Sequence, residues 1–592
     1  PPRAGAPAGG GGGPPRGNGN FWQNGRAAPP KRCAARFTFD CDCGTMLHMR
    51  EPRKNEKHLH FRRRLGNGAQ LVLVGVLTGA FAGVLVTLYT VLASMAEEFS
   101  RGYYGFFRDN PAFVPLLFLA LALGAVIAGG IVRFLPYIRG SGIPQTEGSM
   151  RGLMRFSWYR SLTGMFAASL LCIFLGLSAG SEGPSILIGG SAGAGTSETL
   201  RRSALIRRYQ VTGGACAGLA VAFNAPLTGI AFALEEGQKR FTPEVFVSSF
   251  VSVAAAVIVR NVLYAGFRLP VGAYFTTFSF AQADMLAPMF YVYVVFAAVL
   301  VALAGVAFYY ALFAAKKLFA GIRFWKGVGK FLIPFLLAGA AGLVTANVMG
   351  GGHAFIASLG SGASGVERVF SSPLWATLLI VFFLKFCVTV FNMGAGVPCG
   401  AFIPMLAIGA GAGALVSLLT ARMGMPAAYA DALIVICMAV FFTTLVRAPV
   451  TGVLLTVELT WNFAFLLPAL IGVAAGYLIG DVFRLKPVYD RLLEDMLAEG
   501  GVGKTRPFAA EYAVTAHSPA AGRTLRDVLL PADVRITRVR RGEKLFIPDG
   551  NTALLAGDTV LAEGDLEENS DAPVQLAEIL GAPKDAQKSA KP

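Results

Sequence analysis

Three long stretches of the chain, residues 71–96, 110–132 and 285–315, contain no Asp, Glu, Lys or Arg. Each is longer than the roughly 20 apolar residues that a helix needs to span the hydrocarbon core of a bilayer. The composition agrees, because the 592 residues are 54% hydrophobic and only 15% charged, whereas about a quarter of a soluble domain is charged. The sequence therefore predicts an integral membrane protein whose long uncharged stretches are transmembrane helices.

Between residues 160 and 481 the apolar segments are shorter and less even, and Gly and Pro interrupt them. Irregular backbone at membrane depth is tolerated only where it is buried in protein or lines a wet cavity. These segments therefore cannot all be simple crossings, and we expect a site built from interrupted helices.

The net charge of +17 is unevenly distributed, because residues 1–66 hold 13 Lys and Arg against 4 Asp and Glu. Arg62, Arg63 and Arg64 directly precede the first apolar stretch, as in the positively charged cytoplasmic flank of a membrane span. We therefore expect a cytoplasmic N-terminus and no nucleic-acid binding. Residues 1–66 are also rich in Gly and Pro, a composition typical of a disordered segment.

The membrane region contains an internal repeat. Residues 224–230 (NAPLTGI) match residues 447–453 (RAPVTGV), and in both copies a glutamate follows six residues after the Gly. Further upstream, residues 184–189 (PSILIG) match residues 404–409 (PMLAIG) at an offset of 220, close to the 223 of the first pair. Two halves with Gly- and Pro-interrupted segments at corresponding places are typical of a transporter whose substrate site lies between the repeats.

From about residue 505 the pattern changes to short alternating segments, such as residues 534–539 and 559–562, with Gly-containing turn signals between them. This pattern predicts a small soluble α/β domain over residues 505–565. The residues that follow, 566–592, are polar and predict a loose tail.

Three glycine-proline clusters stand out in the membrane region, at residues 140–144 (GSGIP), 180–184 (GSEGP) and 400–404 (GAFIP). Gly permits close backbone approach, and Pro suits the first turn of a helix, so each cluster predicts a helix N-terminus. A helix N-terminus presents free amide groups and about half a positive charge. Several of them directed at one point make an anion site that binds weakly enough to release the ion.

In order and spacing, the three clusters resemble the signature sequences of the CLC family of chloride channels and chloride/proton antiporters, and the similarity extends over most of residues 67–495. The resemblance implies an all-α polytopic membrane protein with broken helices. It also implies two inverted-topology repeats, at about 67–280 and 285–495, and a homodimer with one pathway per subunit.

The resemblance assigns the chloride site residue by residue. Ser141 matches the serine whose hydroxyl contacts the central anion, and Tyr489 matches the tyrosine whose phenol completes the site. The backbone amides of Ala401 and Phe402 match the third contributor. For Tyr489 the alternative is an aromatic residue at the membrane interface. The signature positions that carry the resemblance are Gly140, Gly142, Ile143, Pro144, Gly180, Gly183, Pro184, Gly400 and Pro404.

Two glutamates are candidates for proton transfer. Glu182 lies in a stretch, residues 161–200, whose only other charged residue is Glu198, and an ionisable group in such a stretch is a functional candidate by default. By resemblance, Glu182 is the gating glutamate and Glu236 is the internal proton-transfer glutamate of the antiporter members. The alternative for Glu236 is that, with Glu235, it is one of two solvated charges at a helix end.

The chain departs from the family pattern at two positions. Ser181 stands where many members have Lys or Arg, and Gln145 replaces a common carboxylate, so we expect an altered pH dependence. Residues 518–525 and 547–558 resemble the C-terminal half of RCK-type regulatory domains rather than paired CBS domains. This suggests a prokaryotic protein with a cytoplasmic module that either binds an unknown small-molecule regulator or braces a dimer.

The favoured hypothesis is chloride/proton antiport in a prokaryotic inner membrane, with both termini cytoplasmic and membrane lipid around the helices. A passive chloride channel on the same fold is the alternative, and a fluoride-selective transporter is less favoured because the GSGIP signature is present. The sequence has no His/Cys/carboxylate cluster at metal-ligand spacing, no nucleotide fingerprint and no nucleophile elbow. We therefore expect neither an enzyme nor a bound metal or cofactor.

Overall fold

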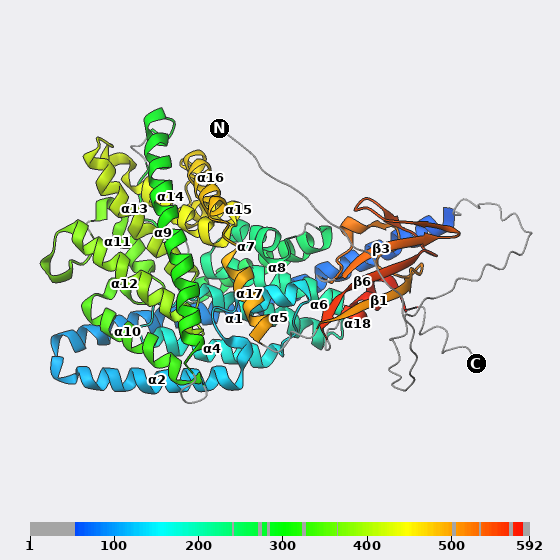
Figure 1. The fold of residues 1–592 in the computed structure, drawn as a ribbon, viewed down its shortest axis with the longest axis horizontal. Coiled ribbons are helices and arrows are strands. Elements are labelled where there is room, and N and C mark those ends of the chain that lie inside the picture. The colour runs from blue at the N-terminus through cyan, green and yellow to red at the C-terminus, as the bar shows by residue number, and fades with distance from the viewer. Residues whose placement is uncertain are drawn as a thin grey trace, which may run out of the picture. The chain divides into compact units, whose positions relative to one another are not determined.

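The structure, a computed structural model, is mainly helical, and a small β-sheet domain follows the helices (Figure 1). Residues 1–53 of the segment expected to be disordered lie outside the described residues. The structure describes residues 54–239, 242–269, 275–280, 284–322, 327–363, 365–499, 505–531, 534–567 and 572–583, with the backbone alone for 54–67.

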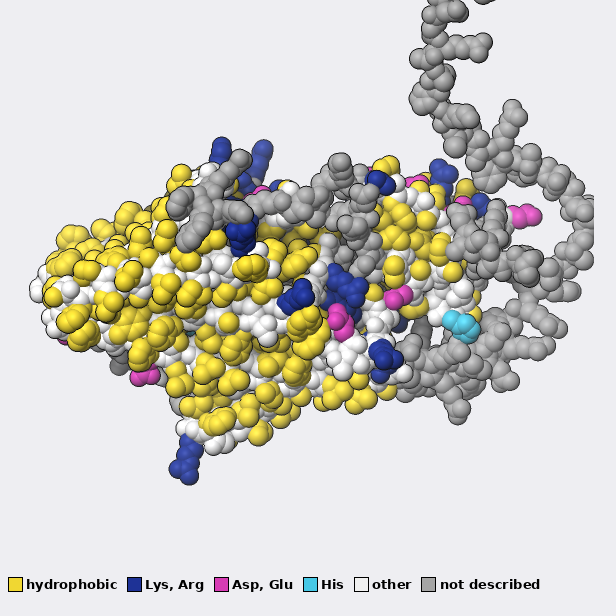
Figure 2. Space-filling view, turned by 90° about the horizontal axis from the view of Figure 1, so that it is seen from below, with side chains coloured by type: hydrophobic (Ala, Val, Ile, Leu, Met, Phe, Trp, Pro, Cys, Tyr) yellow, Lys and Arg dark blue, Asp and Glu magenta, His cyan; other side chains and the backbone are white. Residues whose placement is uncertain are grey.

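Seven helical segments within the described residues are long and apolar enough to cross a bilayer. Three of them, Gly68–Asp109, Pro111–Phe134 and Pro288–Ala320, confirm the spans predicted from the long uncharged stretches. Hydrophobic side chains cover most of the helical surface in Figure 2, and charged side chains are sparse on that face. The protein is therefore a multi-pass membrane protein. The four further spans are Pro243–Gly266, Leu374–Ala395, Phe402–Arg422 and Ala427–Val446.

The other helices are short or begin within the protein interior, as expected from their Gly and Pro content. In chain order the α-helices of the membrane region are α1 (Lys54–Asp109), α2 (Val114–Phe134), α3 (Ile143–Arg151), α4 (Trp158–Phe174), α5 (Glu182–Thr199), α6 (Ala204–Phe223), α7 (Pro226–Phe232), α8 (Pro243–Gly266), α9 (Pro288–Ala320), α10 (Leu332–Val344), α11 (His353–Ala363), α12 (Leu374–Ala395), α13 (Phe402–Arg422), α14 (Ala430–Val446), α15 (Pro449–Thr460), α16 (Leu466–Val482) and α17 (Val488–Glu499).

The two repeats meet at the residues that precede α5 and α13. Gly180 and Gly400 form an antiparallel bridge, in which the Gly180 N–H donates to the Gly400 carbonyl at 2.8 Å and the reverse bond measures 2.9 Å. Equivalent residues of the two halves therefore pair with each other, as in a repeat with inverted topology.

A second pair of equivalent residues locks α7 to α15. The Glu458 carboxylate, on α15, accepts hydrogen bonds from the backbone N–H groups of Leu227 (2.9 Å) and Thr228 (2.7 Å) at the start of α7. A carboxylate at a helix N-terminus satisfies amides that have no partner within the helix and complements the helix dipole. Glu458 is therefore a structural cap.

Glu235 makes the reciprocal contact. It follows α7 and accepts hydrogen bonds from the N–H groups of Val450 (3.0 Å) and Thr451 (2.7 Å) at the start of α15. Each repeat thus caps a helix of the other with the glutamate that follows its Ala-Pro-x-Thr-Gly motif.

Helices α5 and α6 cross at glycine residues that bring their backbones into close contact. A methyl group built on Gly189 would lie 2.2 Å from the Gly214 carbonyl oxygen, and one built on Gly214 would lie 2.2 Å from the Gly189 carbonyl oxygen. Small residues at such crossings allow the backbones to approach closely, which is how helices associate in the absence of a hydrophobic driving force.

Gly189→Ala should therefore destabilise the membrane region by about 1–3 kcal/mol, the cost of overpacking a close contact. The check is the unfolding temperature of the detergent-solubilised protein, which should fall. The matched control is Gly130→Ala on α2, where an added methyl group meets nothing within 4 Å. Equal unfolding temperatures for the two variants would contradict the close packing.

The C-terminal domain is a four-stranded antiparallel sheet in the order β1-β6-β3-β4, with a separate β2–β5 pair. The predicted segments 534–539 and 559–562 lie in two adjacent strands, β3 and β6. The strands are β1 (Thr505–Ala513), β2 (Arg523–Thr524), β3 (Val534–Arg541), β4 (Lys544–Phe546), β5 (Ala553–Leu554) and β6 (Thr559–Glu567).

The prediction of a loose tail over residues 566–592 is wrong for residues 572–580. Residues 572–580 form helix α18 (Ala572–Leu580), whose Leu576, Ile579 and Leu580 are buried in the core of the domain. These apolar residues recur at helical spacing and so give the segment a face to bury, although polar residues surround them in the sequence.

Candidate functional site

The three glycine-proline clusters each lead into a helix N-terminus, as predicted. Helix α3 begins at Ile143, α5 at Glu182 and α13 at Phe402. None of the preceding residues, Gly142, Ser181 and Ala401, makes a side-chain capping hydrogen bond. The side chains of these N-cap residues therefore satisfy none of the first amides, although the Ile143 N–H of α3 donates to the Ser141 hydroxyl at 3.4 Å. Helix amides without a cap are groups that bind anions.

The three clusters also meet in space. A methyl group built on Gly183, in the first turn of α5, would lie 2.6 Å from the Ser141 carbonyl oxygen and 3.0 Å from the Gly400 Cα. Segments about 40 and 220 residues apart in sequence are thus in direct contact at Gly183. Only a residue without a side chain fits there, which is the physical reason for the Gly in this cluster.

Ser141 and Tyr489 are both buried, at 7% and 0% exposure. The Ser141 hydroxyl oxygen accepts the Ile143 N–H at 3.4 Å, a long contact. The Tyr489 hydroxyl, at the start of α17, has no hydrogen-bond partner within the described part of the chain and lies within electrostatic range of Glu147, Glu182 and Glu236. An aromatic residue at the membrane interface would not be fully buried, so that alternative for Tyr489 does not hold.

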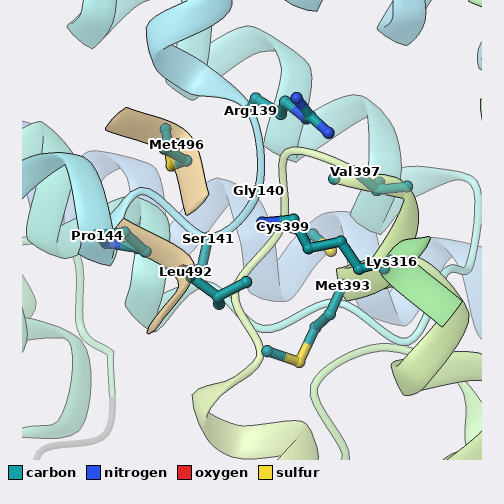
Figure 3. A pocket seen from close by; sticks show the side chains of 12 residues that line it. Arg139, Gly140, Ser141, Pro144, Lys316, Met393, Val397, Cys399, Leu492 and Met496 are labelled. Carbon is teal, nitrogen blue, oxygen red and sulfur yellow. The ribbon is translucent and has the colours of Figure 1, made fainter. Parts of the chain in front are cut away.

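Ser141 lines a pocket that opens between the loop before α3 and the helices α12 and α17 (Figure 3). Two basic residues, Arg139 and Lys316, border it, and the Lys316 Nζ donates to Asp495 at 2.7 Å. Sequence reasoning missed both basic residues, although Arg139 directly precedes the first signature. The other lining residues are Gly140, Pro144, Met393, Gly394, Gly396, Val397, Cys399, Leu492 and Met496.

The Glu182 side chain is completely buried at the N-terminus of α5. Its Oε1 accepts the Ser181 hydroxyl at 3.0 Å and lies 3.2 Å from the His353 Nε2. Its Oε2 has no hydrogen-bond partner among the described residues, and a methyl group built on Gly180 would lie 2.3 Å from that oxygen. Gly180 therefore makes the room that the carboxylate occupies.

The Glu236 side chain is 1% exposed and lies in a π-helical turn, Ala233–Gly237, that follows α7. Its Oε1 has no hydrogen-bond partner in the part of the chain that the structure describes. The two adjacent glutamates thus separate, because Glu235 caps α15 whereas Glu236 turns into the protein. Two solvated charges, the alternative considered from sequence, do not describe Glu236.

A cluster of charged residues surrounds Glu236. Arg151 donates to the Glu236 backbone carbonyl at 2.9 Å, to Glu147 Oε2 at 3.4 Å and to Asp490 Oδ1 at 2.7 Å. Lys239 also contacts Asp490, and the Glu147 side chain is fully buried. The arrangement places a second buried carboxylate in the same cluster as Glu236.

Sequence reasoning did not find Glu147, His353 or Asp490. Glu147 follows the first signature by three residues, Asp490 follows Tyr489, and His353 ends a run of three glycines at the start of α11. Their positions next to these motifs were the sequence signals that could have identified these three residues. No group of three His, Cys, Asp or Glu residues that could hold a metal ion occurs within the described ranges.

Comparison with known proteins gives two family matches. Residues 123–481 match the voltage gated chloride channel family, and residues 509–568 match the TrkA-C domain. The C-terminal sheet domain therefore matches the TrkA-C domain, in agreement with the RCK resemblance of the sequence.

Among similar proteins is the H(+)/Cl(-) exchange transporter ClcA of Yersinia pseudotuberculosis serotype IB (strain PB1/+), 32% identical over 429 residues, which are 69% of this chain and 84% of that protein. The transporter of the same name from Vibrio cholerae serotype O1 (strain M66-2) is 29% identical over 441 residues, 72% of this chain and 90% of that protein.

Solved structures of similar proteins support the same family. A slow cyanobacterial Cl−/H+ antiporter has a TM-score of 0.66 and 25% identity, over 73% of this chain and 99% of its own. A CLC-type fluoride/proton antiporter shares the fold, with a TM-score of 0.56 and 18% identity over 71% of this chain and 97% of its own. With its family match and its relatives, the chain belongs to the CLC family of voltage-gated chloride channels and transporters.

Proposed function

We propose that this protein exchanges chloride for protons across a membrane. The observation that carries the proposal is the pair of buried glutamates, each with one carboxylate oxygen that has no hydrogen-bond partner in the described part of the chain. Glu182 adjoins the three converging helix N-termini, and Glu236 lies in a second carboxylate cluster. Buried ionisable groups in a membrane region are costly, and they persist where they carry protons or ions.

Chloride binds at the uncapped helix ends. The backbone amides of Ala401 and Phe402, the Ser141 hydroxyl and the Tyr489 hydroxyl supply the donors. None of these groups carries a full positive charge, so the anion is stabilised by partial charges and can leave quickly. Arg139 and Lys316 at the pocket raise the local anion concentration before the ion reaches these donors.

Glu182 couples the anion to the proton. When ionised, its carboxylate occupies an anion position beside the N-termini of α5 and α13, and chloride is excluded. When protonated, the side chain has no charge for those dipoles to hold, so it leaves and chloride enters. Chloride entry and proton uptake are therefore linked at this residue.

Glu236 passes protons between Glu182 and the opposite side of the membrane. Its cluster with Glu147, Arg151 and Asp490 contains both signs of charge, so a proton gained or lost there is compensated locally. Protons pass through this carboxylate cluster, whereas chloride is held by the uncharged donors, so the two paths diverge on this side of the protein.

A passive chloride channel on the same fold is the second candidate. In that case Glu182 would open and close the path, but Glu236 would have no proton to carry. The burial of Glu236 favours exchange, because a buried carboxylate in a membrane region is costly and persists where it carries protons or ions. Fluoride transport is less favoured, because Ser141 lies in an intact GSGIP signature.

The remaining expectations follow from the family. We propose that the protein lies in a prokaryotic inner membrane among lipids, with both termini in the cytoplasm and Glu182 facing outward. We also propose that it forms a homodimer and that the TrkA-C domain binds a small-molecule regulator or braces that dimer. The relatives are named transporters, which agrees with a protein that is not an enzyme.

The test is proton flux in proteoliposomes loaded with chloride, with the outer chloride lowered and the voltage held by valinomycin and potassium. We expect protons to enter against their gradient as chloride leaves, so that the outer solution becomes more alkaline. Chloride efflux without proton movement would instead establish the passive channel.

A further inference from the structure

His353 is a titratable group in contact with the gating carboxylate. It begins α11, 171 residues away from Glu182 in the sequence, and its Nε2 lies 3.2 Å from the Glu182 Oε1. The His353 side chain is 26% exposed, whereas the Glu182 side chain is 0% exposed. The imidazole side chain is therefore partly exposed while its Nε2 contacts the buried carboxylate, and its Nδ1 atom is buried.

The backbone around His353 holds this contact in place. The preceding Gly351 packs against the bridge between the repeats, because a methyl group built on it would lie 3.6 Å from the Gly180 Cα and 3.5 Å from the His353 Cδ2. The Phe275 ring covers the imidazole with a centroid distance of 6.2 Å. The imidazole thus lies on the same structural unit that positions Glu182.

Three other charged groups lie near His353. Glu97 and Arg101 on α1 form an ion pair at 3.0 Å and interact electrostatically with the imidazole. Lys385 on α12 is buried and donates to the Val348 and Gly350 carbonyl oxygens at 3.1 and 3.2 Å. Glu182, Glu97 and Arg101 thus interact electrostatically with the imidazole, whereas Lys385 contacts the glycine run that precedes it.

We propose that His353 is the proton relay between Glu182 and the outer solution, an inference that rests on the proposed exchange function. In the relay step, the protonated imidazole transfers its Nε2 proton to the Glu182 Oε1. This leaves a carboxylic acid and a neutral imidazole that keeps its Nδ1 proton. Once the protonated Glu182 side chain has moved away, the vacated Nε2 takes one proton from outer water. The reverse sequence releases a proton to the outside.

The sequence at Ser181 fits this assignment. Here the Ser181 hydroxyl donates to Glu182 without adding charge. A cation near the carboxylate favours its ionised form. In this chain the imidazole supplies that positive charge only when it is protonated, so the charge beside Glu182 depends on the outer pH.

The experiment measures coupled chloride and proton flux in proteoliposomes while the pH on the Glu182 side is varied. We expect His353→Gln, which keeps a hydrogen-bond donor but cannot titrate, to slow both fluxes by roughly a hundredfold, the lower end of the range for positioned proton-transfer groups. The ratio of chloride to protons should not change, and the part of the pH profile that follows imidazole titration should disappear. His517→Gln, at an exposed histidine of the C-terminal domain, is the control and should match the wild type.

Chemical rescue separates a relay from a structural role. In His353→Ala, added imidazole should restore the flux. Pyrazole has a similar shape but is not protonated to a cation near neutral pH, so it should not restore the flux. Wild-type rate and pH profile in His353→Gln, or equal rescue by both compounds, would overturn the relay. If the wild-type protein itself moves chloride without protons, the exchange function fails and the relay fails with it, so the two failures are distinguishable.

Discussion

Proton transport stops in Glu182→Gln while chloride still crosses the membrane. The glutamine amide has nearly the shape of the protonated carboxyl group but cannot take up or release a proton. We expect the uphill proton flux to fall at least roughly 100-fold, as for the loss of a positioned proton-transfer group. Chloride flux should persist and should no longer depend on the outer pH, because no charged side chain remains to compete with the anion.

The measurement is simultaneous recording of chloride efflux and outer pH from the same proteoliposomes. Glu198→Gln is the matched control, because Glu198 lies on the same helix but pairs with Arg207 at 3.1 Å near the helix end. It should keep the coupling of the wild type. Uphill proton movement in Glu182→Gln would remove this residue from the proton path.

The second large effect is expected for Glu236→Gln. Proton flux should again fall to background, since the amide cannot pass a proton between Glu182 and the opposite side. Chloride flux should persist but, unlike in Glu182→Gln, should still depend on the outer pH, because the gating carboxylate remains titratable. Recording chloride flux as a function of outer pH therefore distinguishes the two variants, although both lose proton transport.

The adjacent residue provides the control for Glu236. Glu235→Gln weakens the cap on α15 and should cost about 1 kcal/mol in stability, the typical loss at a helix cap, but it should leave proton coupling intact. Thermal unfolding in detergent measures the first effect and the flux assay measures the second. Loss of coupling in Glu235→Gln, with Glu236→Gln still coupled, would reverse the roles assigned to the two glutamates.

The TrkA-C domain bears on how such a transporter is controlled. Its core forms from β1, β3 and β6 together with α18, so the helix that follows the sheet is part of the folded domain. A regulator that binds this domain can act on transport only if it binds two states of the protein with different affinity. Flux measured with and without a candidate ligand would therefore need to differ before a regulatory role is assigned.

Local sequence was sufficient to predict three of the seven described membrane spans, the internal repeat and the three helix N-termini. The length of an apolar stretch, the φ preference of Gly and the missing N–H of Pro each affect only nearby residues. Each feature can therefore be read from the short stretch of sequence that contains it. Glu182 also stood out locally, because a charge in an apolar stretch is costly wherever the stretch lies, whereas Glu236 was assigned only by the family resemblance.

Only the tertiary structure decided which of two adjacent glutamates caps a helix and which is buried, because the partners of Glu235 lie about 215 residues away. The same holds for His353 and Glu182, which are 171 residues apart, and for the Glu147 cluster. These residues gain their roles from contacts between elements that the repeats bring together. The sequence determined which helices form and where they are interrupted, whereas the packing of the two repeats determined which polar groups meet.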